Sequence, residues 1–153
     1  MRIRPARPDE AEQLSALALR SKAYWGYDAA FLEACREELT LDAAGIERRR
    51  TAVAEGGGRV LGFITLVGAP PQGELGMLFV EPDTIGRGVG RRLVEHLRAQ
   101  ATALGFRRLT IDADPYAEPF YLAMGATRIG TTPSESIPGR ELPLLALEIT
   151  AAD

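Results

Sequence analysis

The sequence predicts a mixed α/β fold with a central, mostly antiparallel sheet of about seven strands and about four helices. Three observations favour this fold class. Apolar segments of strand length recur along the chain, a long amphipathic pattern covers residues 89–104, and the breaks between segments are no longer than turns. At 153 residues, the chain 1–153 is expected to form a single domain.

The N-terminal third contains a short strand followed by two helices. Residues 2–6 are expected to form the strand. Pro8 and the two carboxylates after it are typical of a helix start, because proline fits the first turn and acidic side chains stabilise the positive end of the helix dipole. A second helix is expected to begin near Asp28, with Phe31 and Cys35 on its apolar face.

The rest of the chain alternates strands with two helices. The glycines at 56–58 predict a hairpin between the first two strands of this part, and Gly105 is placed to cap the long helix. A shorter helix is expected to stop at Gly125. The expected strands are 46–55, 59–67, 74–80, 107–111, 126–132 and 142–149, and the helices are 89–104 and 116–124.

The composition excludes several classes of protein. A net charge of −3 argues against nucleic acid as the main partner, because phosphate backbones are bound by basic surfaces. No apolar run approaches the roughly 20 residues that span a bilayer, so no membrane partner is expected. With one cysteine, Cys35, and one histidine, His96, neither an internal disulfide nor a metal site is expected. We therefore expect a soluble, cytoplasmic protein, and a homodimer remains open.

A glycine-rich turn between residues 86 and 90 is the first candidate for a ligand site. Gly86, Gly88 and Gly90 follow a strand and open directly into the long helix, so their N–H groups meet the positive end of the helix dipole. Arg87 and Arg91 add positive charge suited to a polyphosphate. The spacing fits neither a P-loop nor a dinucleotide-binding fingerprint. Taken alone, the glycines are also compatible with a helix entry that binds nothing.

Two motifs together resemble those of the GCN5-related N-acetyltransferase (GNAT) family. That family has a strand ending in Val-x-Pro, then Gln/Arg-x-x-Gly-x-Gly/Ala, and here residues 80–82 and 88–90 match. Its second signature is a short helix of the form Asn-x-x-Ala-x-x-aromatic/Leu-Tyr-x-x-x-Gly. The residues at the positions of this signature are Asp114, Ala117, Phe120, Tyr121 and Gly125. The motifs have the family's order and separation, and the resemblance covers essentially the whole chain.

The resemblance implies acetyl-CoA as a co-substrate. The pyrophosphate would lie on the turn at 86–90, and a splay between the fourth and fifth strands (74–80 and 107–111) would admit the pantetheine arm. A backbone N–H near Val80 would polarise the acetyl carbonyl. The residues expected to bind the cofactor are Phe79, Val80, Ile85, Gly86, Arg87, Gly88, Val89, Gly90, Arg91, Asp114, Ala117 and Tyr121.

The sequence departs from the family pattern at two positions. Ile85 stands where the family has Gln or Arg, which removes one polar contact near the pyrophosphate. Because backbone donors do not depend on that side chain, weaker or adjusted binding is expected instead of loss. Asp114 replaces an asparagine, and a carboxylate there is less favourable to a phosphorylated ligand.

Acetyl transfer to an amine needs a proton donor for the thiolate and an acceptor for the ammonium proton. Tyr121 matches the family tyrosine near the cofactor sulfur and is the candidate general acid; a packed helix tyrosine is the alternative. Glu74 lies where histone-modifying members carry their glutamate and is the candidate general base. Water alone is the alternative to Glu74, and Asp112 and Asp114 are rivals at the end of the next strand.

The acceptor is expected to be a primary amine of a small molecule or a protein. An aromatic cluster of Tyr24, Trp25 and Tyr27 would lie over the acceptor site and could surround a cation. A small satellite core or a dimer contact explains this cluster equally well. Arg140, in the segment 134–140, could meet an acceptor carboxylate or could lie in a plain surface loop.

These observations predict an N-acetyltransferase that works by direct attack of an amine on acetyl-CoA. The first rival is a non-catalytic acyl-CoA-binding or sensor module, which Ile85 and Asp114 permit. The second is an enzyme that uses the same glycine turn for ATP, against which the missing Lys-Ser/Thr pair argues.

Overall fold

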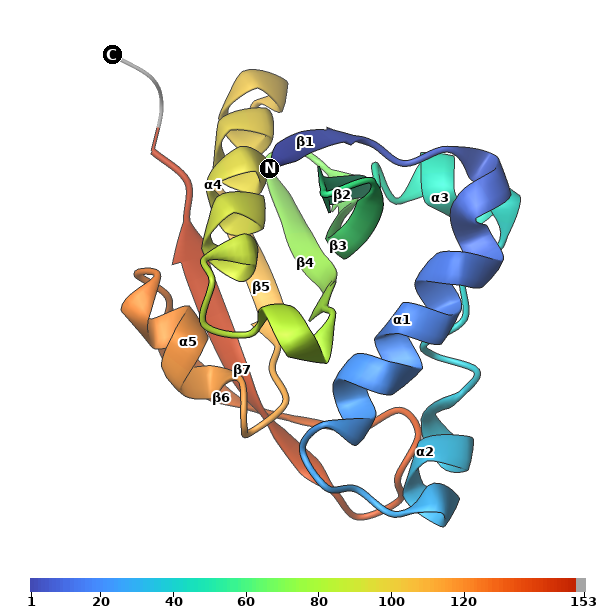
Figure 1. Cartoon of the computed structure of the whole chain (residues 1–153). Coiled ribbons are helices and arrows are strands. Elements are labelled where there is room, and N and C mark those ends of the chain that lie inside the picture. The colour runs from blue at the N-terminus through green and yellow to red at the C-terminus, as the bar shows by residue number, and fades with distance from the viewer. Residues whose placement is uncertain (151–153) are drawn as a thin grey trace.

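The computed structural model describes residues 1–150 and contains one seven-stranded sheet, in the order β1-β2-β3-β4-β5-β7-β6. Helices α1, α2 and α3 cover one face, and α4 and α5 cover the other (Figure 1). The strands are β1 (Arg2–Pro5), β2 (Ala52–Gly56), β3 (Arg59–Ala69), β4 (Gln72–Val80), β5 (Arg108–Asp112), β6 (Thr127–Pro133) and β7 (Glu141–Glu148). The α-helices are α1 (Ala11–Ala23), α2 (Ala29–Cys35), α3 (Ala43–Arg48), α4 (Val89–Leu104) and α5 (Glu118–Ala123), with 3-10 turns η1 (Pro8–Glu10) and η2 (Pro82–Thr84).

The predicted fold class is confirmed, with one error in the assignment of elements. All sheet neighbours are antiparallel except β4 and β5. The expected strand 46–55 is wrong in its first half, which is helix α3, and β2 begins only at Ala52. Asp42 explains the difference, since its carboxylate accepts a hydrogen bond from the Gly45 N–H at 2.6 Å and caps a helix that buries Ile46.

Helix α4 anchors the larger of two hydrophobic cores. Leu93, Leu97 and Ala101 are fully buried on its sheet-facing side, against apolar side chains of β3, β5 and β7. Gly105 ends the helix with a φ of 90°, a left-handed conformation that glycine adopts without strain. This packing places the N-terminus of α4, and hence the glycine turn, beside the end of β4.

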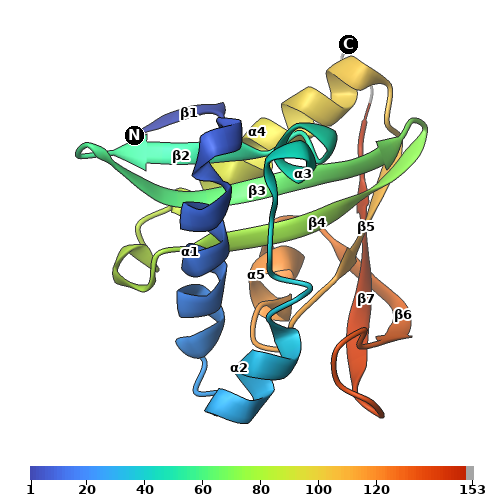
Figure 2. The same ribbon diagram turned by 90° about the vertical axis from the view of Figure 1, so that its right-hand side faces the viewer.

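The opposite face of the sheet is covered by α1, α2 and α3. Leu14 and Leu17 of α1 pack with Ile46 of α3 and with Phe63 of β3 in a second core. Helix α1 runs across β3 and β4 (Figure 2). Its C-terminal end therefore approaches the part of the sheet where β4 and β5 separate.

The sheet opens between β4 and β5. These strands are paired in parallel only at their starts, from Gln72 opposite Arg108 to Glu74 opposite Thr110. Beyond Glu74, β4 stays paired with β3 while β5 stays paired with β7, so the two halves of the sheet diverge (Figure 2). The edge of β4 that faces the gap therefore has no neighbouring strand from Leu75 to Val80, which confirms the predicted splay.

A β-bulge lies in β4 where the splay begins. Ile64 and Leu78 are partners and so are Leu66 and Leu75, so that Thr65 alone lies opposite two residues of β4. The fully buried Thr65 hydroxyl accepts a hydrogen bond from the Met77 N–H at 2.8 Å. A Cβ at Gly76 would come within 2.9 Å of that hydroxyl oxygen, so the bulge requires both residue types.

We expect Thr65→Val to lower the free energy of unfolding by roughly 1–3 kcal/mol, because it keeps the side-chain shape and leaves the buried Met77 N–H without an acceptor. Thr65→Ser keeps the acceptor and is the matched control, with a smaller loss from the missing methyl group. Urea unfolding measures both variants. Equal stability of Thr65→Val and the wild type would show that the hydroxyl does not hold the bulge.

Candidate active site

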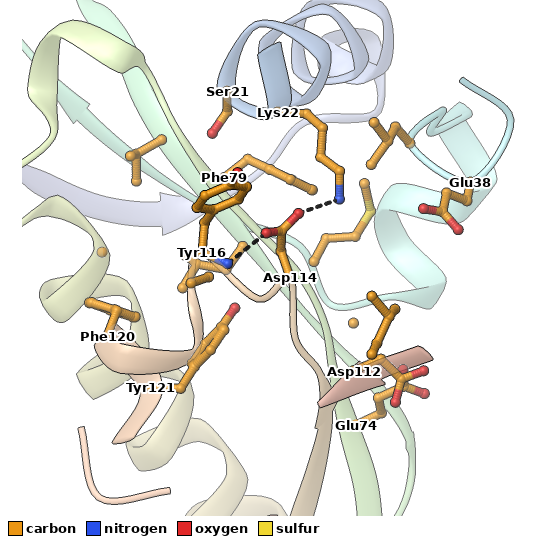
Figure 3. A pocket seen from close by; sticks show the side chains of 18 of the residues that line it. Ser21, Lys22, Glu38, Glu74, Phe79, Asp112, Asp114, Tyr116, Phe120 and Tyr121 are labelled. Atoms are coloured by element: carbon orange, nitrogen blue, oxygen red, sulfur yellow. Dashed lines mark hydrogen bonds and ion pairs between the residues drawn. The ribbon is translucent and has the colours of Figure 1, made fainter. Parts of the chain in front are cut away.

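One continuous cavity of about 1060 Å³ occupies the gap between β4 and β5. Its walls come from α1, the segment after α2, β4, the glycine turn, the end of β5 and α5 (Figure 3). Most residues predicted from the sequence line it: Trp25, Glu74, Phe79, Val80, Ile85, Gly86, Gly88, Val89, Gly90, Arg91, Asp114, Ala117 and Tyr121. The sequence therefore predicted residues that the fold does bring together.

The glycine turn has the backbone geometry of an anion site. Gly86 and Gly88 have φ of 85° and 83°, in the left-handed region, and a Cβ on either would meet nothing within 4 Å. The first amides of α4 have no intrahelical acceptor, since the Arg92 N–H makes the first bond back to the Gly88 carbonyl. These donors lie at the positive end of a 16-residue helix.

Gly90 lets α5 approach the turn closely. A Cβ at this position would lie 3.2 Å from Phe120 Cζ of α5. Arg91 adds a cation to the cavity wall, whereas Arg87 is exposed and is not among the lining residues. Ile85 also lines the cavity and is 40% exposed, so its side chain offers apolar surface to a ligand but no hydrogen-bonding group.

Tyr121 is the most buried titratable side chain of the cavity wall, with 7% of its surface exposed. It comes from α5, and its hydroxyl points into the cavity (Figure 3). Burial, and then the negative charge of Asp114, raise the pKa of the phenol well above its ordinary value. The phenol is therefore protonated at neutral pH and is available as a hydrogen-bond and proton donor.

Asp114 has a structural environment that explains its charge. Its Oδ2 accepts hydrogen bonds from Lys22 Nζ and the Tyr27 hydroxyl, each at 2.9 Å. Its Oδ1 accepts one from the Tyr116 N–H at 2.9 Å, and Figure 3 draws the contacts with Lys22 and Tyr116. Burial would raise the pKa of this carboxyl, but the Lys22 charge and these hydrogen bonds outweigh it and lower the pKa below its ordinary value. Asp114 is consequently an ionised anchor and an unfavourable proton acceptor.

The pKa values of Glu74 and Asp112 are shifted in the opposite direction to that of Asp114. They lie side by side at one end of the cavity, away from Tyr121 (Figure 3). Burial, followed by the charges of Asp112 and Glu135, raises the pKa of Glu74 above its ordinary value, with Arg49 opposing the shift. Desolvation and Glu135 also raise the pKa of Asp112. Raised carboxyl pKa values suit a group that takes up a proton near neutral pH.

The same end of the cavity, which we call the acceptor end, is rich in carboxylates. Those lining it come from separate parts of the chain, and two arginines partly balance them. Glu135 and Arg49 lie near Glu74 and Asp112 at this end, and Glu37, Glu38 and Arg48 line the same cavity. A positively charged ligand would be favoured there by the excess of negative charge.

The predicted aromatic cluster is only partly in the cavity wall. Trp25 lines the cavity and stacks on Tyr116, with ring centroids 5.3 Å apart and planes inclined by 4°. Tyr24 is 53% exposed, and neither Tyr24 nor Tyr27 is among the lining residues. Arg140 is not a lining residue either: it donates to the Tyr27 hydroxyl at 2.7 Å and lies over the ring of Phe31.

Comparison with known proteins decides the family of this fold. The sequence profile of the Acetyltransferase (GNAT) family matches residues 16–126, which contain both sequence motifs. The chain belongs to the GNAT family. This membership confirms the predicted resemblance and the predicted enzyme class, an acetyltransferase.

Relatives of this GNAT chain include two proteins named as acetyltransferases. The chain is 32% identical to the peptidyl-lysine N-acetyltransferase YjaB of Salmonella typhimurium, over 95% of both chains. It is also 40% identical to an amino-acid acetyltransferase of Ralstonia nicotianae, over 39% of this chain and 14% of that longer protein.

Solved structures show the same GNAT architecture. A GCN5-related N-acetyltransferase from Rhodopseudomonas palustris superimposes with a TM-score of 0.78 at 28% identity, covering 96% of this chain and 94% of the other. The PaiA N-acetyltransferase of Thermoplasma acidophilum, solved with coenzyme A, has a TM-score of 0.79 at 17% identity, covering 96% and 98%.

Several residues of this GNAT site escaped the sequence analysis. Lys22 and Tyr116 line the cavity, as does Glu135 from the segment between β6 and β7. Lys22 could have been singled out from the sequence, since it is the only lysine among 18 lysine and arginine residues. Glu135 and Tyr116 carried none, because only the fold brings their loops to the cavity.

We expect Glu74→Gln to raise the melting temperature near neutral pH. The native pKa of Glu74 lies above the unfolded value, so ionisation at neutral pH destabilises the native state. The stabilisation by the variant should shrink as pH falls through the raised native pKa and vanish below about pH 4, where the carboxyl is protonated in both states. Differential scanning calorimetry from acidic to neutral pH measures this. The exposed Glu95→Gln on α4 is the control and should change little; a pH-independent effect of Glu74→Gln would contradict the account.

Proposed function

We propose that the whole chain is one acetyl-CoA-dependent N-acetyltransferase domain that transfers the acetyl group directly to a primary amine. One observation carries the proposal: the unpaired edge of β4, the glycine turn and the protonated Tyr121 all line the same cavity of a GNAT fold. A ligand with an anionic end and an extended amide-containing arm fits this combination of surfaces.

Acetyl-CoA would lie with its pyrophosphate on the amides of Gly86, Gly88 and Gly90, near Arg91. Its pantetheine arm would follow the free edge of β4, where Phe79 and Val80 line the cavity. A backbone N–H near Val80 would donate to the thioester oxygen. The coenzyme A complex of the similarly folded Thermoplasma protein supports this choice of co-substrate.

The proposed reaction forms a C–N bond and breaks the C–S bond of the thioester. The acceptor reaches the site as an ammonium ion, and Glu74, directly or through water, removes a proton so that the nitrogen lone pair can attack the carbonyl carbon. Collapse of the tetrahedral intermediate expels the CoA thiolate, which takes a proton from Tyr121. The second proton of the amine leaves through the same base, and solvent restores the phenol.

The environments of the carboxylates favour Glu74 as base over Asp114. Glu74 lies at the last paired position of β4 and β5, with a raised pKa and two neighbouring acidic groups. Asp114 is engaged by Lys22 and has a lowered pKa. Asp112 shares the surroundings of Glu74 and can act with it or take over part of its role.

The acceptor is proposed to be a small cationic amine. The carboxylates at the acceptor end would attract an ammonium group, and Trp25 offers an aromatic face at the rim. The relative that acetylates peptidyl-lysine supports the other option, a protein amine, which would present the same ammonium group on a peptide.

The proposed function predicts acetyl-CoA consumption that depends on an added amine and favours amines with more than one positive charge. CoA release can be followed with a thiol reagent while spermidine, a lysine-containing peptide and glycine amide are compared at equal concentration. We expect kcat/KM to be highest for spermidine or the peptide. Binding of acetyl-CoA without turnover on any amine would instead support the acyl-CoA-binding module, which the exposed Ile85 in place of a polar residue permits.

Tyr121→Phe is expected to lower kcat by about 10²-fold or more, because the thiolate loses its proton donor. The dissociation constant of acetyl-CoA, measured by calorimetry, should stay near the wild-type value, since the ring and its packing are kept. Leu122→Ala on the exposed side of the same helix is the control. An unchanged kcat would remove Tyr121 from the mechanism.

A further inference from the structure

The only lysine of the chain is buried beside the cavity. Lys22 is the single lysine among 18 basic residues, and every other basic position is arginine. Its side chain is 10% exposed and its Nζ lies 2.9 Å from Asp114 Oδ2, while the Asp114 side chain is 13% exposed. A charge pair so removed from water interacts strongly, and each partner is costly to leave alone.

Asp114 joins segments that are far apart in the sequence. On one side of Asp114 lie Lys22 at the end of α1, Tyr27 before α2 and Arg140 before β7. Arg140 donates to the Tyr27 hydroxyl at 2.7 Å and lies 3.8 Å from Asp114 Oδ2. We call Lys22, Tyr27, Asp114 and Arg140 the Asp114 cluster. We call the segments 25–31 and 134–140, of which Trp25 and Glu135 line the cavity, the acceptor wall.

On its other side, Asp114 organises the start of α5. Its Oδ1 accepts from the Tyr116 N–H, and its carbonyl oxygen accepts from the N–H groups of Ala117 at 2.8 Å and Glu118 at 3.1 Å. Helix α5 carries Tyr121 and lies against the glycine turn through Phe120 and Gly90. Asp114 thus connects the acceptor wall to the helix that contacts the cofactor groove.

A second contact, between aromatic rings, joins the acceptor wall to the start of α5. The Trp25 ring of the acceptor wall is stacked on Tyr116, two residues after Asp114, and Tyr27 meets Tyr116 edge to face with centroids 5.7 Å apart. Movement of the α5 start would therefore disturb both the charge cluster and the aromatic stack. The Asp114 cluster and the aromatic contacts of Tyr116 therefore both join the acceptor wall to the start of α5.

We propose that Asp114, held by Lys22, is a positioning residue that couples the cofactor groove to the acceptor wall, so that binding of acetyl-CoA orders the wall for the amine. The inference rests on the proposed function. Asp114 does not touch the reacting atoms; it places α5 and the wall relative to each other. Ligand-induced ordering of one part is then transmitted to the other as a loss of local mobility.

Amide hydrogen exchange with and without saturating acetyl-CoA tests the coupling. In the wild type, acetyl-CoA should slow exchange at residues 84–92 and 114–121 and also across the acceptor wall, by at least about threefold. In Asp114→Asn, the slowing at residues 84–92 should persist while that of the acceptor wall is lost. Asparagine keeps the size and one acceptor oxygen for the Tyr116 N–H, so the variant removes the charge and the acceptor that Lys22 and Tyr27 share.

Matched variants separate coupling from simple damage. Lys22→Met should also lose the transmitted slowing, whereas Lys22→Arg, which keeps a cation for Asp114, should retain it. Because Arg140 still faces Asp114 in Lys22→Met, this variant is the milder one and keeps the test decisive if Asp114→Asn unfolds. Arg36→Met breaks the exposed pair with Glu33 just after α2 and should behave as the wild type.

Kinetics with spermidine as acceptor provide a second readout. The coupling predicts that Lys22→Met raises the KM for spermidine at least about fivefold while the dissociation constant of acetyl-CoA changes less than twofold. Slowed exchange at residues 84–92 without any effect on the acceptor wall of the wild type would overturn this inference alone. No slowing at residues 84–92 would overturn the proposed function and this inference with it.

Discussion

Pairing between β4 and β5 stops after Glu74 and Thr110, and the cavity exists because of that interruption. The bulge opposite Thr65 makes it possible, since the Thr65 hydroxyl replaces the lost ladder bond of Met77 and Gly76 leaves room for it. Two cores hold the diverging halves in place, one under α4 and one under α1 to α3. A local irregularity in one strand is thereby converted into a groove with free backbone donors and acceptors.

Burial disfavours the charged form of Asp114, Glu74 and Asp112 alike, and the neighbours of each carboxyl decide the net direction of its pKa shift. Asp114 meets a lysine and several hydrogen-bond donors, and its pKa is lowered. Glu74 and Asp112 meet Glu135 and each other, and their pKa values are raised. One cavity therefore contains an ionised structural anchor and a pair of carboxyls with raised pKa values, and Tyr121 stays protonated between them and the glycine turn.

Much of this arrangement was predictable from the sequence. Hydrophobic periodicity and glycine placement located α4, the β2–β3 hairpin and the turn at 86–90, because these are local signals. Helix α3 was missed because its capping residue, Asp42, precedes only a short turn of helix in a polar stretch. The role of Asp114 could not be read, since its partners Lys22, Tyr27 and Arg140 lie 92, 87 and 26 residues away from it in the sequence.

The central claim is that the groove between β4 and β5 binds acetyl-CoA. A thermal-shift titration with acetyl-CoA, with ATP measured in parallel, tests it most directly. A ligand that binds only the folded state stabilises it by about 2.7 kcal/mol at about 100 times its dissociation constant, which is a readable shift. The account predicts saturable stabilisation by acetyl-CoA and none of comparable size by ATP. No shift at millimolar acetyl-CoA, or an equal shift with ATP, would contradict it.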